Sequence, residues 1–180
     1  MNTQNQYDRA FHQCREIFLK KVQDYGTSWR VLRMISIVDQ IFIKAIRIRN
    51  IQELQQQMIA DDITSEFKGI VNYAVIGLIQ IDKGTYTVED LSAEETEKLY
   101  GEKITIAREL MMNKNHDYGE AWREMSQQSF VDMILVKLLR IKQILSNDGR
   151  TLISEGIDAN FLDIINYSIF ALILIEEGKH

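Results

Sequence analysis

The chain has 180 residues, of which 46% are apolar and 26% charged, and this ordinary globular composition suits one domain or two packed halves of about 90 residues each. The net charge of −5 excludes a general polyanion-binding surface, so we expect no nonspecific nucleic-acid binding. The single cysteine, Cys14, excludes an internal disulfide framework and a cysteine-rich zinc site, and it fits a reducing cytoplasm.

The N-terminal segment and the apolar runs predict neither export nor a membrane span. Residues 1–6 lack the basic start followed by an apolar run that a signal peptide requires. The apolar stretch from Ile164 to Ile175 falls short of the roughly 18 residues that a transmembrane helix needs. We therefore expect a soluble, cytoplasmic protein with no membrane partner.

Helices are predicted along most of the chain. The sequence contains no proline, which permits long uninterrupted helices. Apolar residues recur at steps of three and four, the spacing of one helical face, at Val38, Ile41, Ala45, Ile48 and Ile51. The predicted helices span roughly residues 6–23, 30–58 and 62–82, and then 93–115, 123–146 and 155–177.

The two halves of the chain are copies of each other. Residues 14–51 align with residues 107–144 at a shift of 93, with 16 identities in 38 positions. The pair Asn72-Tyr73 returns as Asn166-Tyr167 at a shift of 94. Because such self-similarity marks a tandem duplication, we predict an all-α helical bundle of about six main helices, built from two three-helix repeats with pseudo-twofold symmetry.

The repeats are predicted to span residues 1–84 and 85–180. A half of this size buries little core alone, so we expect the two to share one core. Just after the short linker between them, Ser92-Ala93-Glu94-Glu95 matches a capping box that opens the fourth helix.

A lysine and an arginine three positions apart occur at equivalent places in both halves, as Lys44 and Arg47 and as Lys137 and Arg140. Each lysine falls within the apolar stripe of its predicted helix, where a lone charge is costly. We therefore expect all four head groups to point into the interior or a cleft, near carboxylates of the third helix of a half. Two interpretations stay open: structural ion pairs with those carboxylates, or a cationic cleft for a phosphate group.

Acidic residues are concentrated on the last predicted helix. Asp163, Asn166 and Tyr167 lie at i, i+3 and i+4 on one face, and Glu155 and Asp158 lie at its start. Asp163 is flanked by apolar residues, so its carboxylate needs a lysine, an arginine or a divalent cation as partner. The equivalent position in the first half is a glycine. We therefore predict that the second half holds the better acidic site.

The segment Asp-Tyr-Gly-x-x-Trp occurs between the first and second predicted helices of each half. Its glycines, Gly26 and Gly119, suit a left-handed turn or a helix C-cap. The aromatic residues either anchor the turn in the core or stack on a nucleobase, and the aspartates either bond to the backbone or hold a metal or a sugar hydroxyl. These residues are Asp24, Tyr25 and Trp29, and Asp117, Tyr118 and Trp122.

Lys-x-x-Asp-Tyr-Gly, then Lys-x-x-Arg on a following helix, then Asp-x-x-Asn-Tyr, resembles the nucleotide modification associated domain type one family in a tandem-duplicated bacterial form. The resemblance covers residues 12–80 and 105–175, approximately, and implies a nucleotide ligand. More remotely, the helical, carboxylate-bearing pattern is similar to the MazG-like nucleoside triphosphate pyrophosphohydrolases, which use Mg²⁺. The Glu-x-x-Glu pair of those enzymes is not evident here.

Two hypotheses for the function follow. In the first, the protein is a metal-dependent pyrophosphohydrolase of a nucleoside triphosphate or a modified nucleotide, and Glu155, Asp158 and Asp163 hold catalytic Mg²⁺. In the second, it is a noncatalytic helical module, monomer or homodimer, that binds a nucleotide or a partner protein and uses its charges in ion-pair networks. The candidate substrate-binding residues are Lys44, Arg47, Lys137, Arg140, Asp24, Tyr25, Trp29, Asp117, Tyr118, Trp122, Asn166 and Tyr167.

Overall fold

The computed structural model describes residues 2–56, 62–86 and 88–180, which form six α-helices and two short 3₁₀-helices without any strand. The first repeat contains α1 (Thr3–Tyr25), η1 (Ser28–Val31), α2 (Met34–Leu54) and α3 (Ile63–Lys83). The second repeat contains α4 (Ala93–Tyr118), η2 (Ala121–Glu124), α5 (Gln127–Ser146) and α6 (Ile157–Glu176). The predicted all-α bundle of two three-helix repeats is confirmed.

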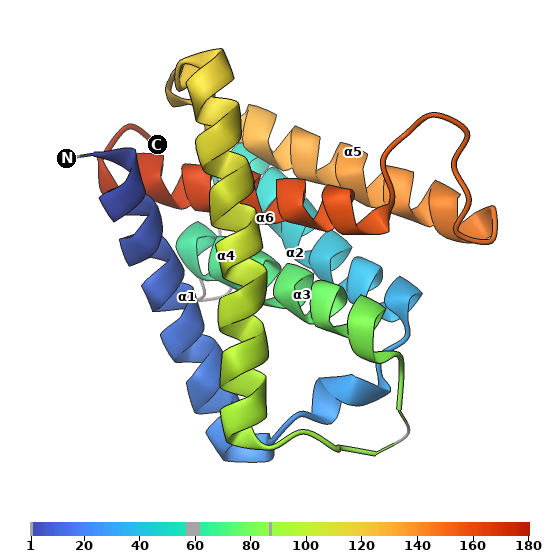
Figure 1. Ribbon diagram of the computed structural model, residues 1–180. Coiled ribbons are helices and arrows are strands. Elements are labelled where there is room, and N and C mark those ends of the chain that lie inside the picture. Colours follow the sequence, from blue (N-terminus) through green and yellow to red (C-terminus); the bar gives the residue numbers. More distant parts are fainter. Residues whose placement is uncertain (1, 57–61, 87) are drawn as a thin grey trace.

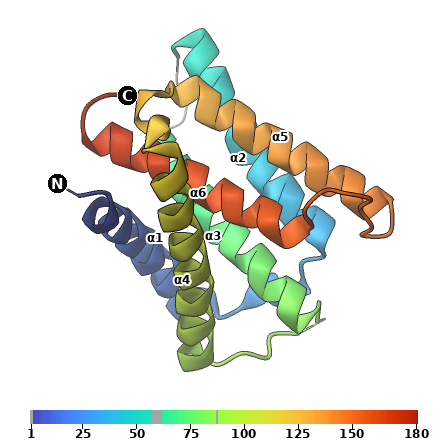
Figure 2. The same ribbon diagram turned by 45° about the horizontal axis from the view of Figure 1, so that its top comes forward.

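The helices pack as three pairs, and each pair takes one helix from each repeat. α3 and α6 pack against each other in the middle, with α2 and α5 on one side of them and α1 and α4 on the other (Figure 1). The turned view in Figure 2 shows α2, α3, α5 and α6 running in similar directions, while Figure 1 shows α1 and α4 at a steep angle to α6 and converging at one end. This pairing of equivalent helices is the arrangement that pseudo-twofold symmetry requires.

The middle pair is buried over most of its length because other helices cover it from both sides. Buried apolar residues of both repeats, among them Phe67 of α3 and Phe161 of α6, belong to one cluster. Within the described residues, α6 is the one helix long and apolar enough to cross a membrane, and 72% of that stretch is buried inside the protein. Such burial is the pattern of a core helix.

The start of the second helix of each repeat differs from the predicted boundary. α2 and α5 begin at Met34 and Gln127, rather than near residues 30 and 123, because a 3₁₀ turn precedes each of them. Gly26 and Gly119 are the C-caps of α1 and α4 with positive φ angles of 65° and 61°, which confirms the predicted helix C-caps, and Gly119 is in the left-handed helical region. α2 ends at Leu54, and the predicted helical residues 57 and 58 lie outside the described residues.

Side chains cap the starts of several helices. Ser92 accepts a hydrogen bond from the Glu95 backbone N–H at 3.1 Å, which confirms the predicted cap of α4. Asp62 caps α3 in the same way through the Ser65 N–H at 2.7 Å. This hydrogen bond stabilises the ionised carboxylate and lowers the pKa of Asp62 below its ordinary value.

Two equivalent hydrogen-bond networks join the repeats inside the core. Asn72 of α3 accepts a hydrogen bond from the Tyr100 hydroxyl of α4 at 2.6 Å and donates to a backbone carbonyl of α1 at 3.1 Å. Asn166 of α6 accepts from the Tyr7 hydroxyl of α1 at 2.8 Å and donates to a backbone carbonyl of α4 at 3.1 Å. Burial raises the pKa of both tyrosines, so both remain donors. Each asparagine thus connects its own repeat to the other.

Candidate functional site

Each repeat carries a pocket where the turn after its first helix meets its third helix. The first pocket has a volume of about 580 Å³ and includes the end of α1, η1 and parts of α2 and α3. The second pocket has a volume of about 390 Å³ and includes the end of α4, η2 and α6. The residues of the first pocket used below are Lys21, Tyr25, Trp29, Lys44, Glu66, Lys68, Gly69 and Tyr73.

The two pockets are copies of each other. Every residue that lines the second pocket has its repeat equivalent in the lining of the first. Lysine, tyrosine and tryptophan recur unchanged from the Lys-x-x-Asp-Tyr-Gly-x-x-Trp segment, and the tyrosine of Asn-Tyr recurs from the third helix. An important chemical difference lies in the N-terminal half of the third helix, where Gly69 in the first pocket corresponds to Asp163 in the second.

The carboxylate in the lining of the second pocket pairs with two lysines. Asp163 is 6% exposed, and its two carboxylate oxygens lie 2.7 Å from Lys114 Nζ and 2.8 Å from Lys137 Nζ. Burial by itself lowers the pKa of Lys114, but the hydrogen bond and the charge of Asp163 outweigh it and raise that pKa. Both ammonium groups therefore already have an anionic partner inside the protein.

The first pocket keeps an excess of positive charge. Its lining has three lysines, Lys21, Lys44 and Lys68, against one carboxylate, Glu66, whereas the second lining has one lysine against one aspartate. Glu66 lies 2.8 Å from Arg47 and 3.5 Å from Lys44. Lys21 and Lys68 form no ion pair with any residue of the described ranges. The first pocket is therefore the one suited to an anion.

Three of the four cations of the duplicated Lys-x-x-Arg pattern lie beside carboxylates of a third helix, as predicted. Lys44 and Arg47 pair with Glu66 of α3, and Lys137 pairs with Asp163 of α6. The prediction is wrong for Arg140, which is exposed. The physical reason is that an asparagine stands in the second repeat where Glu66 stands in the first, so Arg140 lacks the carboxylate that holds Arg47.

The predicted acidic cluster is not brought together. Glu155 and Asp158 are exposed, while Asp163 is buried and engaged by two lysines. Within the described residues, no group of three or more Asp, Glu, His or Cys side chains is placed to hold a metal ion. Because Mg²⁺ needs several oxygen ligands with free lone pairs, these residues do not fit the magnesium site expected from the sequence.

The aromatic residues of the repeated segment line both pockets, and its aspartates line neither. Tyr25 and Tyr118 are exposed at the rims, while Asp24 and Asp117 are exposed outside the pockets. Tyr167 lines the second pocket, and so does Asn166, although its amide is used by the core network.

The two tryptophans differ in how much of the ring is covered. In the second pocket Trp122 stacks on Phe170 with ring centroids 4.2 Å apart, and the Arg123 guanidinium lies 4.4 Å from the Trp122 ring centroid. In the first pocket the residue equivalent to Phe170 is Ile76, and Trp29 is only partly buried. Trp29 therefore offers more ring surface to a ligand than Trp122 does.

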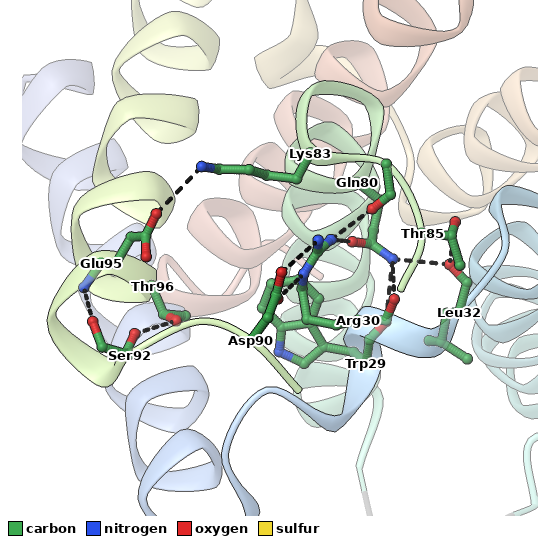
Figure 3. A network of polar contacts seen from close by, with 11 residues as sticks. Trp29, Arg30, Leu32, Gln80, Lys83, Thr85, Asp90, Ser92, Glu95 and Thr96 are labelled. Carbon is green, nitrogen blue, oxygen red and sulfur yellow. Dashed lines mark hydrogen bonds and ion pairs between the residues drawn. The ribbon is translucent and has the colours of Figure 1, made fainter. Parts of the chain in front are cut away.

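Arg30 fixes the turn that carries Trp29 (Figure 3). Its guanidinium is fully buried and donates to Asp90 of the linker at 2.8 Å, to the Gly84 carbonyl at 2.7 Å and to Gln80 of α3. Gln80 in turn donates to two backbone carbonyls of the turn at 2.9 Å. These contacts connect η1 to α3 and to the linker, so the part of the pocket wall that η1 forms is fixed by both.

Lys21, Lys68 and Gly69 were not predicted as site residues. For Lys21 a signal existed, because this lysine and Lys114 are identical in the two repeats and precede the repeated tyrosine by one helical turn. From the sequence, Gly69 was noted only as the position where the first repeat lacks the aspartate of the second. In the structure, the absence of a carboxylate at this position leaves the neighbouring lysines without an anionic partner there.

Comparison with known proteins identifies one family. The model of the family described as nucleotide modification associated domain 1 matches residues 21–81 and 114–175, one segment in each repeat. No curated protein and no solved structure matches the chain. Nothing in these comparisons supports the more remote resemblance to the MazG-like pyrophosphohydrolases.

Proposed function

The chain belongs to the nucleotide modification associated domain 1 family, and from this premise we propose that it is a nucleotide-binding protein whose site is the first pocket. The family description supplies the nucleotide-related role. The single observation that supports this location is the excess of lysines over carboxylates in the first pocket, compared with the neutral second pocket.

The phosphates of the ligand bind to the lysines. Lys21 extends from the last turns of α1, Lys44 from α2 and Lys68 from α3, so positive charge enters the pocket from three elements. An ammonium group forms short, charge-assisted hydrogen bonds with phosphate oxygens, and these are about twice as strong as hydrogen bonds between neutral groups. Lys21 and Lys68 bring such groups without a competing ion pair in the described part of the chain.

The base of the ligand contacts the aromatic residues. Tyr25, Trp29 and Tyr73 line the same pocket as the three lysines. The indole N–H of Trp29 is buried and has no hydrogen-bond partner among the described residues. An aromatic wall beside a cationic group is suited to a molecule with one flat face and one anionic end. The volume of about 580 Å³ lies within the range of small-molecule sites.

Binding is better supported than metal-dependent hydrolysis. The hydrolase hypothesis places Mg²⁺ on Glu155, Asp158 and Asp163, of which two are exposed and the third is held by two lysines. Those residues also belong to the second repeat, whereas the cationic pocket belongs to the first. The geometry therefore favours the noncatalytic alternative.

The test is a calorimetric titration of the wild type and two matched variants with nucleoside mono-, di- and triphosphates. Lys21→Ala removes an unpaired cation of the first pocket, and we expect it to weaken binding about tenfold or more, since a hydrogen bond to a charged group contributes roughly 1.5–3 kcal/mol. Lys114→Ala removes the equivalent lysine of the second pocket and should leave the affinity unchanged.

Two results contradict the proposal. One is a loss of nucleotide affinity in Lys114→Ala but not in Lys21→Ala. The other is pyrophosphate release from the same nucleotides with Mg²⁺ or Mn²⁺ that disappears in Asp163→Asn, because this establishes the hydrolase instead.

A further inference from the structure

We propose that the terminal phosphate of the nucleotide lies beside Gly69, between the amines of Lys21 and Lys44, at the place that the Asp163 carboxylate takes in the second pocket. In the second repeat the Asp163 carboxylate is the anionic group between the two lysines, and in the first repeat a phosphate group of the ligand has that role. This inference rests on the proposed function and adds the position and charge of the bound group.

The proposed subsite follows first from the equivalence of the two pockets. Asp163 binds Lys114 and Lys137 at 2.7 Å and 2.8 Å, so a lysine from the first helix and a lysine from the second hold one anionic group on the third. Both lysines are kept in the first repeat, as Lys21 and Lys44, while the anionic side chain is absent there. Two cations placed for an anion, without that anion, form an anion-binding subsite.

The side chain next to Gly69 also supports the subsite. A β-carbon at this position would lie 2.9 Å from Lys44 Cε and 3.2 Å from Lys44 Nζ, so the end of the Lys44 side chain lies directly over the glycine. The glycine also lines the first pocket. The ammonium group of Lys44 is therefore presented at the spot where a side chain would otherwise begin.

The ion pairs of the first repeat leave Lys44 available. Lys44 Nζ lies 3.5 Å from Glu66, whereas Arg47 lies 2.8 Å from the same carboxylate. Glu66 is therefore held mainly by Arg47, and its contact with Lys44 is longer than the 2.8 Å contact between Lys137 and Asp163. A phosphate oxygen offers Lys44 a closer and more strongly charged partner.

The experiment fills the subsite in the first repeat and empties it in the second, with inorganic pyrophosphate as the calorimetric probe. Gly69→Asp supplies the missing carboxylate, and we expect pyrophosphate binding to fall at least about tenfold while the melting temperature stays equal or rises. Gly101→Asp is the matched control, because it adds the same charge to α4 at a helical glycine with no side chain around it. It should bind like the wild type.

In the second repeat, Asp163→Gly removes the carboxylate and its volume, and the stoichiometry should rise from one pyrophosphate per chain to two. Asp163→Asn removes the charge but keeps the volume, so its stoichiometry should stay at one. Since Gly69→Asp adds an ion pair rather than breaking one, its result decides the question even where Asp163→Gly is unfolded.

The outcomes separate this inference from the proposed function. Wild-type pyrophosphate binding that Gly69→Asp leaves unchanged overturns the subsite, as does a wild type that binds no pyrophosphate. Nucleotide binding that persists in Gly69→Asp also overturns the subsite but leaves the nucleotide proposal standing. Pyrophosphate binding that depends on Gly69, with no nucleotide bound more tightly, supports the subsite and contradicts a nucleotide ligand.

Discussion

At the scale of single residues, the third helices of the two repeats carry a carboxylate at different positions. The first repeat has a glutamate at position 66 and a glycine at position 69, and the second has an asparagine and then Asp163 at the equivalent positions. This one-turn displacement decides which cations are paired. In the first repeat Glu66 forms its closer ion pair with Arg47, so the lysines of the pocket are largely unneutralised. In the second repeat Asp163 forms ion pairs with Lys114 and Lys137, and Arg140 is exposed.

Asp163→Asn should lower the free energy of unfolding by roughly 3–5 kcal/mol, because it leaves the buried Lys137 ammonium without its counter-charge. The measurement is urea denaturation of the wild type and the variant. Asp132→Asn is the control, since the Asp132 side chain is 61% exposed and lies 3.8 Å from an exposed arginine, so its stability should match the wild type. Equal stabilities of Asp163→Asn and the wild type would show that the ion pair is not structural.

Part of this site could be predicted from the sequence. The need of Asp163 for a cationic partner followed from its apolar neighbours, and so did the burial of Lys137. The choice between metal and lysine did not, because Lys114 lies on another helix and only the packing of α4 on α6 brings it within 2.7 Å. The open first pocket could not be predicted either, because the contact between Gly69 and the end of the Lys44 side chain depends on how α2 packs on α3.

At the scale of elements, the helices followed from their periodicity and the turns did not. The second helix was predicted to begin near residue 30, but the Arg30 side chain binds Gln80 and Asp90 of the linker, and residues 28–31 form a 3₁₀ turn. These partners are distant in sequence, so the 3₁₀ turn depends on tertiary contacts that a local pattern does not contain. By contrast, the caps at Ser92 and Gly26 are local and were predicted correctly.

The cap of α3 gives a prediction for pH dependence. Asp62→Ala should lower the free energy of unfolding at pH 7 by about 0.5–2 kcal/mol, because the Ser65 N–H loses its acceptor at the start of the helix that carries Glu66 and Gly69. The folded-state pKa of Asp62 is lowered. Its contribution is therefore present above the ordinary aspartate pKa of about 3.9 and is lost as the pH falls through the folded-state value.

The measurement is urea denaturation of the wild type and of Asp62→Ala between pH 7 and pH 2. The difference in stability between them should shrink toward the acid end of that range. Ser126→Ala is the matched control, since Ser126 caps α5 through the Ser129 N–H at 3.2 Å with a group that does not titrate. A difference for Asp62→Ala that is as constant with pH as that for Ser126→Ala would contradict this role of the carboxylate.

At the scale of the whole molecule, the duplication preserves two equivalent polar networks inside the core. The networks of Asn72 with Tyr100 and of Asn166 with Tyr7 have equivalent partners and similar distances, and each joins both repeats. The pockets above them have diverged in charge and in ring packing. The pattern is that of a fold whose core joins both halves, and we propose that the first half holds the ligand.

Asn72→Leu and Asn166→Leu should each lower the free energy of unfolding by about 1–3 kcal/mol, because each leaves a tyrosine hydroxyl buried without its hydrogen-bond acceptor. Adding Tyr100→Phe to Asn72→Leu should cost less than the sum of the two single changes, since it removes the unpaired hydroxyl. Tyr7→Phe should have the same effect on Asn166→Leu. Denaturation of the single and double variants measures this coupling, and additive costs would contradict a direct connection.

The most direct test of the first pocket as the nucleotide site uses the two tryptophans, which are the only ones in the sequence and line one pocket each. Trp122→Phe leaves Trp29 as the sole indole reporter, and Trp29→Phe leaves Trp122. In a fluorescence titration with a nucleoside triphosphate, we expect a saturable change in Trp122→Phe and none in Trp29→Phe. A saturable change in Trp29→Phe with none in Trp122→Phe would place the ligand in the second pocket and contradict the proposed site.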